Sequence, residues 1–114
     1  MRMVVKCNGV EVVYALNDNA AAKGLVAQLP LELEVQPFSS NEITVYPPSK
    51  LDVSDSQLAG SGGRGVLAHY EPWGDVVFFH DDFEGNSSLF ELGVAESGVG
   101  GIEGMRGTAT LEAL

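Results

Sequence analysis

Two histidines in the second half of the chain have acidic residues close to them in sequence. His69 and His80 are accompanied by Glu71, Asp81 and Asp82, and imidazole and carboxylate are ligand types that transition metals use. The spacing of these residues matches no familiar ligand signature, and histidines on strands are more often core or surface residues than metal ligands. The sequence therefore predicts no metal site, and it points to no cofactor.

Nucleophilic catalysis would need a serine or cysteine beside a histidine and an acid. The serines lie in polar loop-like segments, and none occupies a nucleophile elbow. Cys7 is the only cysteine, so an internal disulfide is impossible, and its place in an alternating strand favours a buried, unreactive thiol.

Residues 60–65 satisfy the pattern G-x-G-x-x-G. A dinucleotide loop requires a strand before the glycines and a helix after them, so that the pyrophosphate meets the helix N-terminus. Here a polar segment precedes the glycines and a strand is predicted after them, which favours a flexible loop. Arg64 within it remains a candidate for binding an anionic ligand.

Charge excludes several classes of partner. The chain has sixteen acidic and six basic residues, for a formal net charge of −10. Nucleic-acid binding needs clustered Lys and Arg, so neither nucleic acid nor an anionic membrane surface is an expected partner. Scattered acidity is typical of a solubility function, with attraction of a cationic ligand as the alternative. No apolar run resembles a signal peptide or a membrane span, and we expect a cytoplasmic protein.

The elements that must position any site are mainly strands. An Asn8-Gly9 pair between two alternating runs predicts a β-hairpin with a type I′ turn. Residues 20–28 have an apolar stripe at helical spacing, and Pro30 ends that helix. Further strands are predicted over residues 31–38, 43–45, 66–70, 75–80, 88–95 and 108–113, with Phe90, Leu92 and Val94 on one face of the strand over 88–95.

Residues 49–65 are the one long irregular segment, and residues 98–106 form a weak helical turn. A chain of 114 residues without a linker is one domain spanning residues 1–114. We therefore predict a mainly β fold: a closed antiparallel β-barrel of about eight strands with one α-helix and one short helical turn, since closure removes sheet edges.

The order of these elements and several motifs resemble the cyclophilin-like superfamily. Residues 89–94 (LFELGV), followed by Ile102 and Met105, resemble the Phe-Gly-x-Val strand and the methionine-bearing helix of cyclophilins. Within the superfamily, the chain is most similar to small prokaryotic cyclophilin-like proteins, through LNDN at 16–19, QLPL at 28–31 and PWG at 72–74. The resemblance covers nearly the whole chain and implies their closed barrel.

The same resemblance implies a groove but not its chemistry. Cyclophilins are prolyl isomerases that polarise the amide with an arginine on the third strand, beside aromatic residues and a histidine. The matching segment here, residues 31–38, contains no arginine, and the histidine position aligns near Leu89. Phe38, Phe79 and Phe83 would supply the apolar lining. Enzymatic activity is therefore left open, and isomerase activity is not the leading hypothesis.

The leading hypothesis is a binding module with an aromatic groove for a small ligand or an extended peptide. Trp73 lies in a predicted tight turn at a barrel end, where pockets open. Tyr46, just before two prolines, is the other aromatic residue expected to border the groove. The expected groove residues are Phe38, Tyr46, Trp73, Phe79, Phe83 and Arg64. The alternatives are a divergent prolyl isomerase and a structural protein that oligomerises through exposed strand faces. Neither the ligand nor the oligomeric state follows from the sequence.

Overall fold

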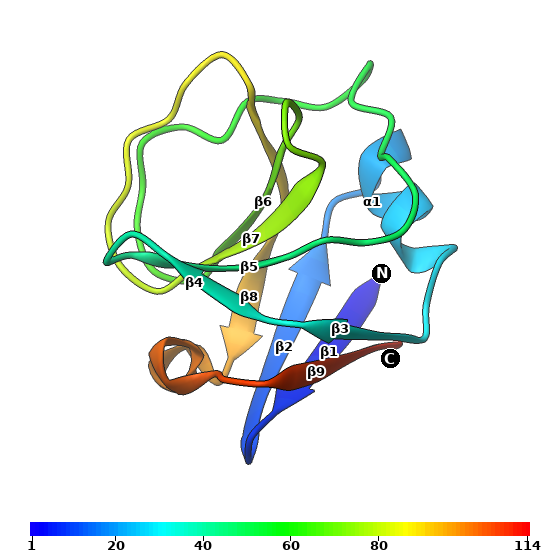
Figure 1. The fold of residues 1–114 in the computed structure, drawn as a ribbon. Helices are drawn as coiled ribbons and strands as arrows, with labels where there is room; N and C mark the ends of the chain where they lie inside the picture. The colour runs from blue at the N-terminus through cyan, green and yellow to red at the C-terminus, as the bar shows by residue number, and fades with distance from the viewer.

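The strands form one antiparallel sheet that curls into a nearly closed barrel (Figure 1). This computed structural model describes all residues, 1–114. The elements in chain order are β1 (Arg2–Cys7), β2 (Val10–Leu16), α1 (Ala20–Val26), β3 (Leu31–Glu34), β4 (Gln36–Phe38), β5 (Glu42–Val45), β6 (Val66–Tyr70), β7 (Asp75–Phe79), β8 (Leu89–Ser97), η1 (Val99–Gly104) and β9 (Thr108–Ala113).

A single extended segment closes the barrel. The strand order is β3-β9-β1-β2-β8-β6-β7-β5-β4, so β3 and β4 lie at the two edges of the sheet although they are consecutive in sequence. Only Val35 separates them, and its N–H donates to the carbonyl of Gly107 over 2.8 Å. The predicted strand over residues 31–38 is therefore two strands, which makes nine instead of about eight. The predicted fold class is confirmed.

β1 and β2 form the β-hairpin that the Asn8-Gly9 pair predicted. Cys7 pairs with Val10, and Asn8 and Gly9 between them have φ values of 52° and 80°. Such positive φ values at both central residues are what a type I′ turn demands, and Asn and Gly tolerate them best. The turn thereby fixes the register of the two strands that bring the N-terminus into the barrel.

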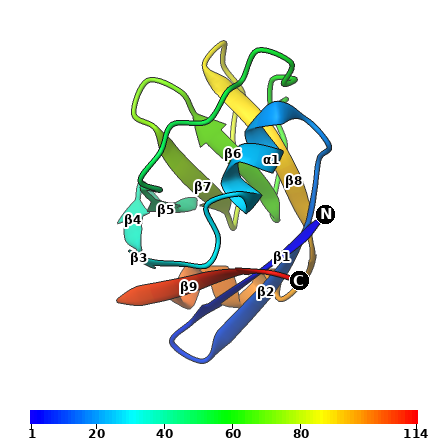
Figure 2. The ribbon, with the colours of Figure 1, turned by 90° about the vertical axis from the view of Figure 1, so that its right-hand side faces the viewer.

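The main core fills the barrel interior, and the two helical elements close it from opposite sides. Ala21, Ala22 and Leu25 of α1 are fully buried in this core, and α1 lies across the barrel opening in Figure 2. Asn19 caps α1 by accepting a hydrogen bond from the Ala22 N–H over 2.9 Å. The predicted turn over residues 98–106 is the 3-10 helix η1, which contributes Ile102 to the same core.

A β-bulge changes which residues of β8 face the core. In the pairing with β6, Leu67 is opposite Gly93 and Ala68 is opposite Glu91, so Leu92 is an extra residue. A bulge of this kind interrupts the alternation of side chains. The prediction that Phe90, Leu92 and Val94 lie on one face was therefore wrong for Val94: Leu92 is fully buried, whereas Val94 is 45% exposed.

Residues 49–65 contain no regular strand or helix, as predicted. Two isolated bridges join this segment to later parts of the chain, one from Leu58 to Phe90 and the other from Gly62 to Phe83. In Figure 1 the segment (green) runs beside the loop that connects β7 to β8 (yellow). The two loops together cover part of the outer face of the barrel. Neither helical element is long and apolar enough to span a bilayer.

Candidate functional site

A cavity of about 240 Å³ lies on the outer face of the barrel, against β7. Side chains alternate between the two faces of a strand. Along β7, Val76 and Phe78 belong to the main core, whereas Asp75, Val77 and Phe79 line the cavity. The cavity and the barrel core therefore lie on opposite sides of the same strand.

The floor of the cavity belongs to a second, smaller apolar cluster. Its members are Ala59, Ala68, Val77, Phe79, Phe83 and Leu89. They come from β6, β7, the start of β8 and the two covering loops, which bury the outer face of β7. This explains why all five residues of β7 are buried, a pattern that a strand has only when both of its faces are covered.

One wall of the cavity is a row of three aromatic rings. Trp73, in the turn between β6 and β7, packs edge-to-face against Phe38 of β4 and against Tyr70 of β6, with ring centroids 5.2 Å apart in both pairs. Edge-to-face contact is the preferred geometry for aromatic pairs. Phe38 and Trp73 nevertheless remain 47% and 50% exposed, so much of their apolar surface is open to a ligand.

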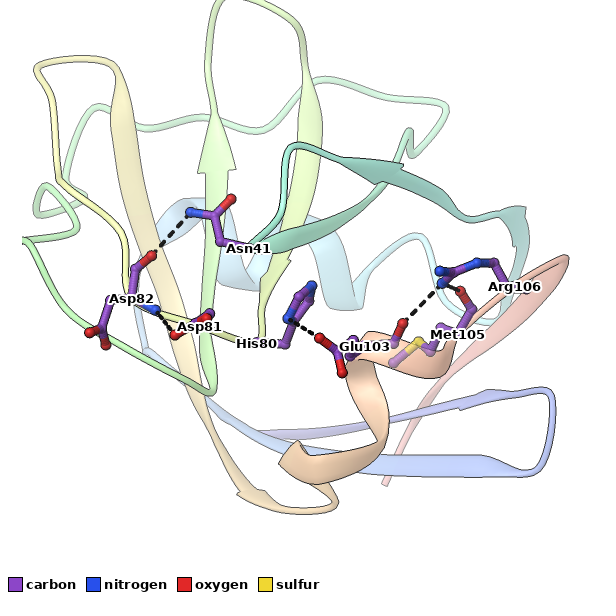
Figure 3. A network of polar contacts seen from close by, with 7 residues as sticks. All are labelled: Asn41, His80, Asp81, Asp82, Glu103, Met105 and Arg106. Atoms are coloured by element: carbon purple, nitrogen blue, oxygen red, sulfur yellow. Dashed lines mark hydrogen bonds and ion pairs between the residues drawn. The ribbon is translucent and has the colours of Figure 1, made fainter.

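Backbone hydrogen bonds hold the opposite wall, which the β7–β8 loop forms. The N–H groups of Gly62 and Phe83 each donate to the other residue's carbonyl, over 3.1 and 3.0 Å. Asn41, which also lines the cavity, donates through Nδ2 to the carbonyl of Asp82 over 3.1 Å (Figure 3). Phe83 is thereby fixed over the floor, and its ring stacks on that of Phe79.

Two carboxyl groups lie among these apolar walls. Asp75 is 1% exposed, and its Oδ1 has no hydrogen-bond partner within the protein. Burial raises the pKa of Asp75 to about 6, against the opposing effect of a hydrogen bond from its own backbone N–H. Burial raises the pKa of Glu42 to about 7, and the negative charge of Asp75 adds to that shift. Carboxyl groups with such raised pKa values exchange protons near neutral pH.

The cavity offers acidic and aromatic groups but no basic side chain. None of its lining residues is Arg, Lys or His. Nothing within it can therefore polarise an amide carbonyl with a positive charge. What the lining can provide is stacking against aromatic rings together with carboxylate oxygens that accept hydrogen bonds.

Four of the six predicted groove residues meet at this cavity. Phe38, Trp73, Phe79 and Phe83 line it, whereas Tyr46 and the exposed Arg64 do not. The cavity was expected at an end of the barrel. It lies instead on the outer wall, because the Trp73 ring packs sideways onto β4 and β6.

Glu42 and Asp75 were not predicted to line the groove. The signal that could have indicated Asp75 is its position at the start of a run that is apolar at every following residue, DVVFF. A continuous apolar run of this kind predicts a strand covered on both faces. A carboxylate on such a strand is expected to be buried, and buried carboxylates without a partner are rare.

Neither histidine lines the cavity, and the two contact different residues. His69 is buried, and its Nδ1 is 2.9 Å from the backbone carbonyl oxygen of Asp75. Burial lowers the pKa of His69. His80 points instead toward Glu103 of η1, with Nδ1 4.0 Å from a carboxylate oxygen (Figure 3). No three His, Cys, Asp or Glu side chains are grouped to hold a metal ion.

Cys7 and the glycines of residues 60–65 lie where they support the fold and not a reaction. The Sγ of Cys7 is buried and lies 3.3 Å from the carbonyl oxygen of Arg106, to which it donates. The glycines of residues 60–65 are followed by β6 and not by a helix. They therefore lack the helix N-terminus that a dinucleotide loop requires.

Comparison with known proteins agrees with this barrel. The sequence model of the Cyclophilin-like family matches residues 5–112. The chain therefore belongs to the Cyclophilin-like family. A search of curated proteins finds no match. A hypothetical protein from Archaeoglobus fulgidus, solved in solution, is similar in structure with a TM-score of 0.73 and 15% sequence identity, over 100% of this chain and 95% of that one. At this identity the likeness shows the fold alone.

Proposed function

We propose that this domain is a binding module that holds a small molecule in the outer-face cavity. The observation that carries the proposal is the arrangement of the aromatic side chains. Phe38 and Trp73 leave about half of their surface open on one side, and Phe79 closes the floor between them and the loop. Apolar surface that stays open beside a few convergent polar groups is typical of ligand pockets.

The size of the cavity favours a small molecule over a peptide. Its volume is about 240 Å³, whereas pockets for drug-sized ligands have roughly 300–1,000 Å³. A single ring with a short polar substituent fits such a volume. An extended peptide would need a longer groove with several side-chain pockets. The ligand that we propose is therefore a compact molecule with a planar apolar body.

A prolyl isomerase is the alternative from the enzyme class. The aromatic lining is compatible with a proline ring, but no basic side chain is available in the cavity to polarise the amide. A proline-isomerisation assay on a model peptide separates the two functions. A rate equal to that of buffer removes the isomerase, and a catalysed rate would replace our proposal.

The fluorescence of Trp73 gives a direct test of ligand binding, because it is the only tryptophan in the chain. A screen of small aromatic fragments, including the neutral probe benzyl alcohol, is expected to change its emission saturably. The same screen on Phe83→Ala, in which the cavity loses one of its rings, should give a weaker change. No saturable change across neutral, anionic and cationic fragments would refute the proposal.

A further inference from the structure

One acidic side chain that lines the cavity lacks a hydrogen-bond partner. Asp75 is almost completely buried, it lines the cavity, and its Oδ1 accepts no hydrogen bond from the protein. Buried polar atoms are nearly always paired, because an unpaired one loses its hydration without compensation. A donor supplied by a ligand would remove this deficit, so the orphaned oxygen itself indicates what the ligand carries.

The groups around Asp75 all favour a positively charged donor. The titratable side chains that line the cavity are Glu42 on β5, Tyr70 on β6 and Glu84 in the β7–β8 loop, and none of them is basic. Burial raises the pKa of the phenol of Tyr46, which follows β5, and the negative charge of Asp75 raises it further. No cation of the protein therefore neutralises the two carboxyl groups.

We propose that the ligand of this cavity carries a cationic nitrogen with N–H donors, which Asp75 binds directly while Glu42 faces it across the cavity. This inference rests on the proposed function, because it names the chemistry of a ligand in the same site. Charge-assisted hydrogen bonds to a carboxylate are stronger than neutral ones. The rings of Phe38 and Trp73 add a cation–π surface for the same group. The formal net charge of −10 raises the local concentration of cations.

The binding of a cationic ligand should also change the protonation of Asp75 and Glu42. Burial holds the pKa of Asp75 at about 6. Burial, together with the negative charge of Asp75, holds the pKa of Glu42 at about 7. A bound cation stabilises the ionised forms and lowers both pKa values. Binding between pH 6 and 7 therefore releases protons, and acidification below the pKa of Asp75 weakens binding.

The test compares two probes of the same shape, benzylamine and benzyl alcohol, titrated into the full chain by calorimetry and by NMR. We expect benzylamine to bind more tightly by roughly tenfold, the ratio that one charge-assisted hydrogen bond produces. Calorimetry in buffers of different ionisation enthalpy should report proton release for benzylamine alone. A quaternary analogue, benzyltrimethylammonium, has charge but no N–H donor and should lose most of the advantage.

Substitutions of the two carboxylates test whether the preference for benzylamine arises in this cavity. Asp75→Asn should abolish the preference for benzylamine while benzyl alcohol still binds, and Glu42→Gln should reduce the preference if the first variant does not fold. The control is Asp18→Asn, which makes the same charge change at an exposed residue that pairs only with Lys23, 3.6 Å away. Equal affinity of the two probes in the native chain, or a preference that survives in both cavity variants, overturns the cationic ligand. Failure of both probes to bind refutes the proposed function itself.

Discussion

The rings of Phe79 and Phe83 stack almost parallel, with centroids 3.9 Å apart and an interplanar angle of 13°. Phe79 is on β7, and Phe83 is in the loop that follows it, so the stack folds the loop back over the outer face of its own strand. Together with the paired backbone hydrogen bonds of Gly62 and Phe83, this contact holds the cavity floor against the loop that forms one wall. The integrity of the cavity therefore depends on the packing of these two rings.

Replacing Phe83 with Ala removes the stack and leaves a hole under the loop. We expect a loss of about 3 kcal/mol in the free energy of unfolding, measured with urea, since large-to-small substitutions of buried aromatic residues cost about this much. The control is Phe83→Leu, which keeps an apolar side chain and should lose less than half as much. Equal stability of Phe83→Ala and the native chain would mean that the loop does not depend on this ring.

The close approach of the two covering loops can be tested at Gly85. A Cβ at this position would lie 2.3 Å from the carbonyl oxygen of Ala59. Gly85→Ala must therefore push the loops apart, and we expect a loss of about 1–3 kcal/mol in the free energy of unfolding. Gly60→Ala in the facing loop is the matched control, because nothing lies within 4 Å of its Cβ position. A loss in the control as large as in Gly85→Ala would contradict the proposed close packing.

The raised pKa of Asp75 makes stability depend on pH in a defined direction. Its pKa is about 6 in the folded chain against an ordinary value of 3.8. The folded state therefore favours the protonated carboxyl, and this group's contribution to stability is lost as pH rises from about 4 through about 6.

Asp75→Asn has no charge to bury and does not suffer this loss. The free energy of unfolding of the variant relative to the native chain should therefore increase by about 2–3 kcal/mol between about pH 4 and about pH 8. Urea unfolding at both pH values measures the change. A difference that is constant with pH, or that runs in the opposite direction, would show that burial does not raise the pKa of Asp75.

Trp73 should matter for binding far more than for stability. Its ring is half exposed and forms only edge contacts with Phe38 and Tyr70, so Trp73→Ala should reduce the free energy of unfolding by only about 1 kcal/mol. The same change should weaken the binding of benzyl alcohol and benzylamine alike by roughly tenfold. Calorimetry measures both affinities.

Leu58 provides the comparison for Trp73. It is equally exposed, at 50%, but does not line the cavity. Leu58→Ala should leave both affinities unchanged. Comparable losses in the two variants would indicate a general effect of surface hydrophobic residues and not a specific aromatic wall.

Local patterns in the sequence predict most of this barrel. The turn of Asn8 and Gly9, the helix capped by Asn19 and the alternating strands are all determined by neighbours in sequence. The bulge at Leu92 was not predicted, because it is visible only in the pairing of β8 with β6. The split of residues 31–38 at Val35 depends likewise on pairing with two different partners, β9 and β5.

Of the residues that line the candidate site, only aromatic ones were predicted from the sequence. Phe38, Phe79 and Phe83 were expected from the resemblance to cyclophilins, and Trp73 from its place in a tight turn between two strands. Glu42 is one of sixteen acidic residues, and nothing local distinguishes it from the exposed ones. Asp75 is indicated only by the apolar run that follows it, and that run does not reveal that its Oδ1 lacks a hydrogen-bond partner.

The most direct test of ligand binding in the outer-face cavity is an NMR titration of the full chain with benzyl alcohol, which carries no charge and depends on the cavity alone. We expect saturable shifts of the Trp73 indole N–H and of the backbone amides of Asp75, Val77 and Phe79, while the distant hairpin turn at Gly9 stays unchanged. Shifts that are absent, or that gather at the hairpin instead of the outer-face cavity, would contradict ligand binding there.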